Sequence, residues 1–147
     1  MKRLLLFSVM CMLLIAAAVN AADKVEGTKS CEQCGMDRIS FARSRMMIVY
    51  VDGSTVSTCS LNCTANEVKE NKGKQVKSIM VADYSTKELT DAASASWVIG
   101  GNKPGVMTRL AKWAFARKED AQLFVKENEG RLATFDEALN LALRENE

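Results

Sequence analysis

Four cysteines in two closely spaced pairs are the residues of this chain best suited to do chemistry. The pairs are Cys31 with Cys34 and Cys59 with Cys63, and the sequence contains no histidine. Cysteine thiolates and methionine thioethers are therefore its only soft ligands, a combination that favours Cu(I) over most other metals. The absence of histidine excludes an imidazole base, a zinc site with histidine ligands and a c-type haem attachment motif.

The methionines divide into two groups by their place in the sequence. After residue 22 they are Met36, Met46, Met47, Met80 and Met107. Three of them fall in predicted strands, where we expect them to pack in the core. Met36 follows Cys34 across Gly35, which can take a positive φ, so its thioether and the thiolate can face one ion. Met107 lies in a predicted loop, where its side chain has two possible roles: a third metal ligand, or an apolar side chain that covers the loop.

The spacing of the cysteines leaves three interpretations open, because ligand spacing does not separate a thiolate site from a disulfide pair. The first is a structural zinc site with four thiolate ligands. The second is one or two disulfides, which persist in exported proteins. The third is Cu(I) capture by a subset of the sulfurs.

An enzymatic function is not expected. Without histidine the sequence offers no nucleophile–base pair, and its carboxylates are scattered. The enzymatic alternative is an exported thiol-disulfide redox protein using Cys31 and Cys34. Such a motif normally opens a helix, which lowers the thiolate pKa, whereas here the residues 35–37 lead into a loop and a hairpin.

The N-terminus has the pattern of a cleaved signal peptide over residues 1–21. Lys2 and Arg3 precede an apolar run, and Val19-Asn20-Ala21 provides a cleavage site. The run is short for a membrane span, so we expect no stable span in the mature chain and a periplasmic location. Removal of the two basic residues takes the net charge from +2 to zero. Without a basic stripe, binding to nucleic acid has no electrostatic basis.

The remaining chain predicts an α+β fold. Residues 22–30 are a polar, flexible N-terminal tether. Hydrophobic patterning predicts strands at 45–51, 54–59 and 76–83 and a helix at 61–71 that Ser60 caps. The same β-β-α-β order returns with strands at 96–99, 112–116 and 131–134, a helix at 118–128, and a final helix from an Asp136 cap to about residue 144. The two similar halves span about 31–84 and 95–147.

A hairpin explains how the two cysteine pairs could meet. Asp52-Gly53 is a strong signal for a two-residue turn. The hairpin returns the chain to its starting edge, so that Cys59, at the end of the second strand, lies near the first pair. Cys63 follows one helical turn later and suits a shared site.

An ordered set of motifs across nearly the whole mature chain resembles the NosL family of nitrous oxide reductase accessory proteins. The motifs are Cys31-x-x-Cys34-Gly35-Met36, the Asp52-Gly53 hairpin, Val81-Ala82-Asp83-Tyr84, Trp97-Val98-Ile99-Gly100, Met107, Phe115-Ala116-Arg117-Lys118-Glu119-Asp120-Ala121 with Phe124, and Phe135-Asp136-Glu137. The resemblance implies that residues 31–147 form a NosL-like metal-binding domain of a periplasmic Cu(I) chaperone. Its implied partner is a copper-receiving reductase or the maturation machinery of that reductase.

The resemblance also implies which residues bind copper. It places Cu(I) on Cys34, Met36 and Met107, although the neighbours of Met107 differ from the family pattern. The chain has no lipobox, unlike many family members. Cys59 and Cys63 resemble half of a cysteine-based metal knuckle, so a four-cysteine site for Cu(I), or for zinc, stays open.

Overall fold

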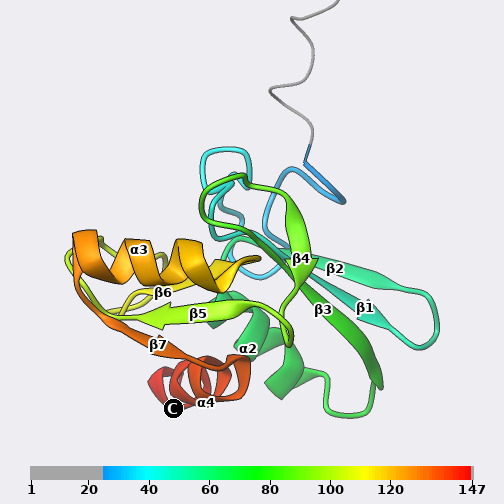
Figure 1. The fold of residues 1–147 in the computed structure, drawn as a ribbon. Coiled ribbons are helices and arrows are strands. Elements are labelled where there is room, and N and C mark those ends of the chain that lie inside the picture. Colours follow the sequence, from blue (N-terminus) through cyan, green and yellow to red (C-terminus); the bar gives the residue numbers. More distant parts are fainter. Residues whose placement is uncertain (1–24, 147) are drawn as a thin grey trace, which may run out of the picture.

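The strands of this chain form two antiparallel sheets (Figure 1), described for residues 25–146 in a computed structural model. The first sheet has the order β2-β1-β3-β4, and the second has the order β6-β5-β7. The strands are β1 (Met46–Tyr50), β2 (Thr55–Thr58), β3 (Val76–Ala82), β4 (Leu89–Asp91), β5 (Ser96–Ile99), β6 (Lys112–Phe115) and β7 (Arg131–Ala133). The helices are α2 (Leu61–Glu70), α3 (Lys118–Asn128) and α4 (Phe135–Glu145).

The predicted repeat of element order is confirmed. Each half runs β-β-α-β, and in each the first strand becomes the central one, pairing antiparallel with the two that follow it. The α+β class and the C-terminal helix are confirmed with it. In the first half the hairpin turns at residues 51–54, and the predicted cap of α2 is Ser60, whose side chain accepts a hydrogen bond from the Cys63 N–H.

One local element was not predicted, and one local prediction was wrong. The link between the halves contains a short strand, β4, which lacks the apolar run that would have revealed it and forms by pairing with the end of β3. The final helix is capped by Thr134, not by Asp136. The Thr134 hydroxyl accepts the Glu137 N–H, and Asp136 lies in the first turn, where a carboxylate suits the helix dipole.

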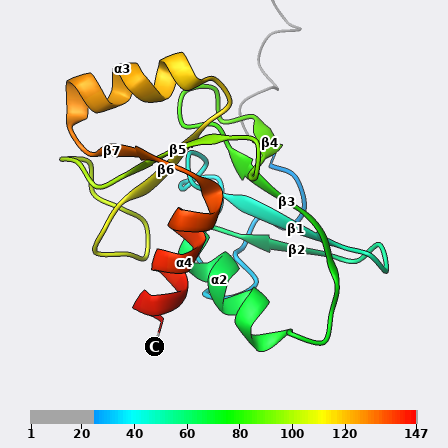
Figure 2. The same cartoon turned by 60° about the horizontal axis from the view of Figure 1, so that its bottom comes forward.

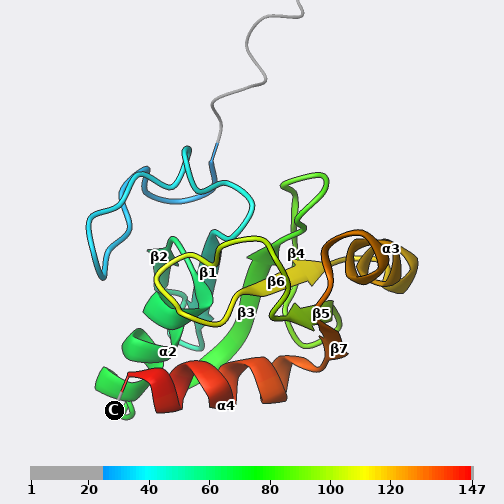
Figure 3. The same ribbon diagram turned by 90° about the vertical axis from the view of Figure 1, so that its left-hand side faces the viewer.

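The second sheet lies between two helices, with α3 on one face and α4 on the other (Figure 2). Phe124 and Ala121 of α3 pack on Val98 and Phe115. On the opposite face, Trp97 belongs to a core formed with α4, α2 and the first sheet. Helix α4 runs beside α2 (Figure 3), so the C-terminal helix joins the two halves through a shared apolar core.

Asp83 makes a second connection between the halves. Its buried carboxylate accepts the Ser85 and Thr86 N–H groups at 2.8 and 2.7 Å, and the Ala116 N–H of the second half at 2.7 Å. Burial alone would raise the pKa of Asp83, but the backbone donors outweigh it and hold the pKa below its ordinary value. The folded protein therefore favours the charged carboxylate.

We expect Asp83→Ala to lower the free energy of unfolding by about 2–4 kcal/mol, because three N–H groups lose their acceptor. Since the folded pKa is depressed, this stabilisation is present above the unfolded pKa of about 3.9 and is lost as pH falls through the folded pKa. Urea unfolding should show a smaller difference in the free energy of unfolding between wild type and Asp83→Ala at pH 3 than at pH 7. Asp52→Ala, which removes a similar turn on the exposed surface, is the control and should change stability little. A constant gap across pH would contradict the account.

The N-terminal segment is described only in part. The predicted signal peptide, residues 1–21, lies outside the described residues. Within the predicted tether, Glu26 pairs with Arg45 at 2.7 Å and the Thr28 N–H donates to Ser57, so this stretch lies against the first sheet. Among residues 25–146, no helix combines the length and hydrophobicity needed to cross a membrane.

Candidate metal centre

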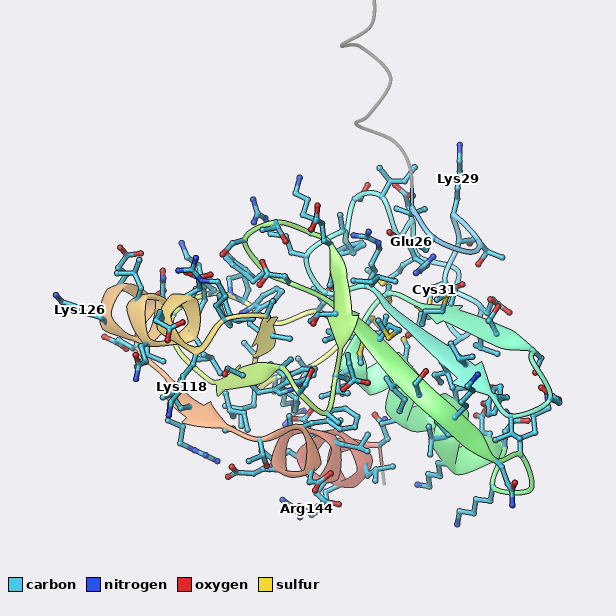
Figure 4. The ribbon with its side chains drawn as sticks, turned by 45° about the vertical axis from the view of Figure 1, so that its right-hand side comes forward. Glu26, Lys29, Cys31, Lys118, Lys126 and Arg144 are labelled. Carbon is cyan, nitrogen blue, oxygen red and sulfur yellow. The ribbon has the colours of Figure 1, made fainter. Side chains whose placement is uncertain are left out.

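The four cysteines converge at one end of the first hairpin. Cys31 and Cys34 lie in the turn before β1, Cys59 directly follows β2, and Cys63 lies in the first turn of α2. Their Sγ atoms all lie within 4.8 Å of one another. The sulfurs gather beside the labelled Cys31 in Figure 4. The hairpin therefore does what its sequence position predicted: it brings both pairs to one point.

The sulfur separations suit a shared ion. Cys59 Sγ lies 3.5 Å from Cys34 Sγ and 3.7 Å from Cys63 Sγ. Four sulfurs in a tetrahedron around zinc, at about 2.3 Å from the metal, are about 3.8 Å apart. A disulfide needs about 2.05 Å, and all four cysteines are free. The group is thus a set of four thiols arranged as ligands, with three of them buried and Cys34 exposed.

Backbone hydrogen bonds fix the turn that carries the first pair. The Gly35 N–H donates to the Cys31 carbonyl at 2.8 Å, and the Cys31 N–H donates to the Met36 carbonyl at 2.8 Å. Gly35 has φ +79°, the conformation expected from its place between the thiol and the thioether. The Cys59 N–H donates to Cys31 Sγ at 3.3 Å. This hydrogen bond ties the first cysteine pair to the residue that follows β2.

The two residues inside the first pair are themselves anchored. Glu32 accepts the Ser57 N–H at 2.7 Å and donates its own N–H to the Ser57 carbonyl at 2.9 Å. Gln33 donates to the carboxylate of Glu67 in α2 at 2.7 Å, and that buried carboxylate also accepts the Tyr50 hydroxyl at 2.9 Å. The turn is therefore held to β2 on one side and to α2 on the other.

The thiols differ in acidity. The hydrogen bond from the Cys59 thiol stabilises the thiolate of Cys63 and lowers the pKa of Cys63 to about 6. The same hydrogen bond, together with burial, raises the pKa of Cys59 well above its ordinary value. Burial raises the pKa of Cys34. A first thiolate for metal capture is accordingly available at Cys63.

The methionines of the first sheet are buried or half-buried, Met36 lies at the cysteine group, and Met107 is exposed. Met46 is buried in the core and Met47 and Met80 are half-buried in the first sheet. Met36 packs on the cysteine group. Met107 is 51% exposed with φ +56°, and lines a surface hollow of about 500 Å³ with Asn62. Its neighbour Val106 packs on the cysteine group. Met107 as a ligand stays a prediction.

Sequence reasoning missed the supports of the site. Glu67 reads as part of a solvent-facing polar helix surface, yet it is buried. Arg38 is fully buried, and its guanidinium donates to four backbone carbonyls around the turn. Gln33 and Glu67 are 34 positions apart in the sequence, so no local sequence pattern predicts their hydrogen bond.

Comparison with known proteins gives a family and a fold. A family model described as NosL matches residues 22–141. A search of curated proteins found no match. Among solved structures, the crystal structure of the copper chaperone NosL from Shewanella denitrificans superimposes with a TM-score of 0.59 at 23% sequence identity, covering 78% of this chain and 95% of that chain.

Proposed function

The chain belongs to the NosL family, and from this premise we propose that it is a periplasmic chaperone that binds Cu(I) and delivers it for maturation of nitrous oxide reductase or a similar cuproenzyme. The chain is not an enzyme. Its partners are a copper-receiving reductase or the machinery that matures it.

The four-cysteine group carries the proposal. Its sulfurs lie within 4.8 Å of one another in a chain without histidine, so every soft donor available to an ion there is sulfur. Thiolate and thioether ligands select Cu(I). We assign Cys31, Cys34, Cys59 and Cys63 as the primary ligands, with Met36 beside them, and keep Met107 as a further candidate ligand.

The separations of 3.5 and 3.7 Å also suit Zn(II), which makes a structural zinc module the second candidate. Metal content and free-thiol count of protein purified from the periplasm separate the candidates. One copper per chain with four thiols that react only after copper removal supports the chaperone. Zinc with protected thiols would contradict the chaperone and indicate a structural zinc module. Metal-free protein with reversible disulfides would indicate a thiol-disulfide redox protein.

A further inference from the structure

A small hollow lies on the protein surface next to the cysteine group. It has a volume of about 190 Å³ and lies between the segment 39–44, Lys87, Val106 and Trp113. Two of its walls, Phe41 and Val106, also pack on the cysteine group. A molecule seated in this hollow would therefore contact the same side chains that cover the proposed copper ligands.

The charged residues that line the hollow are all positive. Arg43 and Lys87 line it, and none of its lining residues carries a carboxylate. The Arg43 guanidinium stacks 5.0 Å from the centre of the Tyr84 ring and donates to the Tyr84 carbonyl, so its position is fixed. The backbone of Lys87 is held by its N–H bond to the Asp83 carbonyl at 2.8 Å. The fixed guanidinium of Arg43 and the exposed ammonium of Lys87 together favour an anionic occupant.

The indole of Trp113 lines the hollow and provides a probe of it. Trp113 is 7% exposed, and among the described residues its Nε1–H finds no partner. The indole of Trp97, by contrast, donates to the Ala92 carbonyl at 2.9 Å. A buried N–H group without an acceptor is unfavourable, and nearly all such groups in proteins are paired. Because Trp113 lines the hollow, its indole N–H signal can report an occupant.

We propose that this hollow receives an acidic side chain, Asp or Glu, of the protein that exchanges copper with this chain. The carboxylate oxygens would meet Arg43 and Lys87, and the methylene groups would lie against the apolar walls. The volume suits one side chain and is below the range of drug-sized ligand pockets. The inference rests on the proposed function, because it takes the occupant from the copper partner.

The indole resonances of the two tryptophans provide the test. We would titrate 15N-labelled protein with the capped peptide acetyl-Gly-Glu-Gly-amide and record the indole N–H signals, assigned with Trp113→Phe. The Trp113 signal should move saturably with a dissociation constant in the millimolar range, and the Trp97 signal should stay in place. The matched peptide with Gln in place of Glu should cause less than a fifth of the shift.

The double variant Arg43→Gln with Lys87→Gln should lose the peptide response and keep the wild-type Cu(I) affinity. An unmoved Trp113 signal, an equal response to the Gln peptide, or a full response in the double variant would overturn the proposal. An equal response to free acetate would also overturn it, since the hollow would then be a small-anion site. Cu(I) affinity is measured separately, so failure of the copper function and failure of the docking site are distinguishable.

Discussion

The double substitution Cys59→Ser with Cys63→Ser is expected to weaken Cu(I) binding by on the order of a hundredfold or more. It removes two of the four thiols, including the one whose lowered pKa makes it the readiest thiolate. Changes even in residues that only support metal ligands cost about 10–100-fold in affinity. Competition with a chromophoric Cu(I) chelator at fixed pH measures the loss directly.

Met80→Leu is the matched control. It removes a sulfur from the first sheet away from the cysteine group and conserves volume, so Cu(I) affinity should be unchanged. Thermal melting of the metal-free double variant separates lost ligands from lost folding. If that variant melts like wild type and keeps wild-type Cu(I) affinity, the second cysteine pair is not part of the copper site, and copper belongs to Cys34, Met36 and Met107.

Arg38→Met is expected to lower the free energy of unfolding by about 3–5 kcal/mol, the largest stability effect that we predict. The guanidinium of this fully buried residue donates to the carbonyls of Glu26 and Thr28 at 2.6 and 2.5 Å, and to those of Thr58 and Met46 at 3.0 and 3.1 Å. Methionine fills much of the volume and donates nothing, so the four carbonyls lose their shared donor. Urea unfolding of metal-free protein measures the change.

Arg117→Met is the control for this substitution, because Arg117 is exposed and its one ion pair among residues 25–146 is with Asp120. It should change stability little, since surface ion pairs contribute little. Arg38→Lys should fall between the two, because an ammonium group cannot reach all four carbonyls at once. Equal effects of Arg38→Met and Arg117→Met would show that the buried guanidinium does not hold the turn to the first sheet.

The elements that sequence predicted best are those whose signals are local. The Asp52-Gly53 turn, the Ser60 cap and the apolar stripe of α3 each specify their own structure, and the predicted bounds of β5 and α3 agree with the observed ones. Strand β4 has three residues and no pattern of its own. It exists because the end of β3 offers an unpaired edge, which only the folded sheet contains.

The same distinction separates the predicted site residues from their supports. The convergence of the four cysteines follows from a hairpin that can be predicted from two turn residues. The burial of Arg38 and Glu67 does not follow from any local signal. Charged residues are seldom fully buried, and the partners of these two lie far away in the sequence. The exposure of Leu123 is likewise not evident from its type: this apolar residue of α3 is 53% exposed, because only one stripe of that helix faces the second sheet.

X-ray absorption spectroscopy at the copper edge, on the protein loaded with one equivalent of Cu(I), tests the central claim most directly. The account predicts a first shell of sulfur alone, with no nitrogen or oxygen neighbour, because the only soft ligands that converge in the structure are thiols with a thioether beside them. A first shell dominated by nitrogen or oxygen would contradict the assignment of Cu(I) to the four-cysteine group.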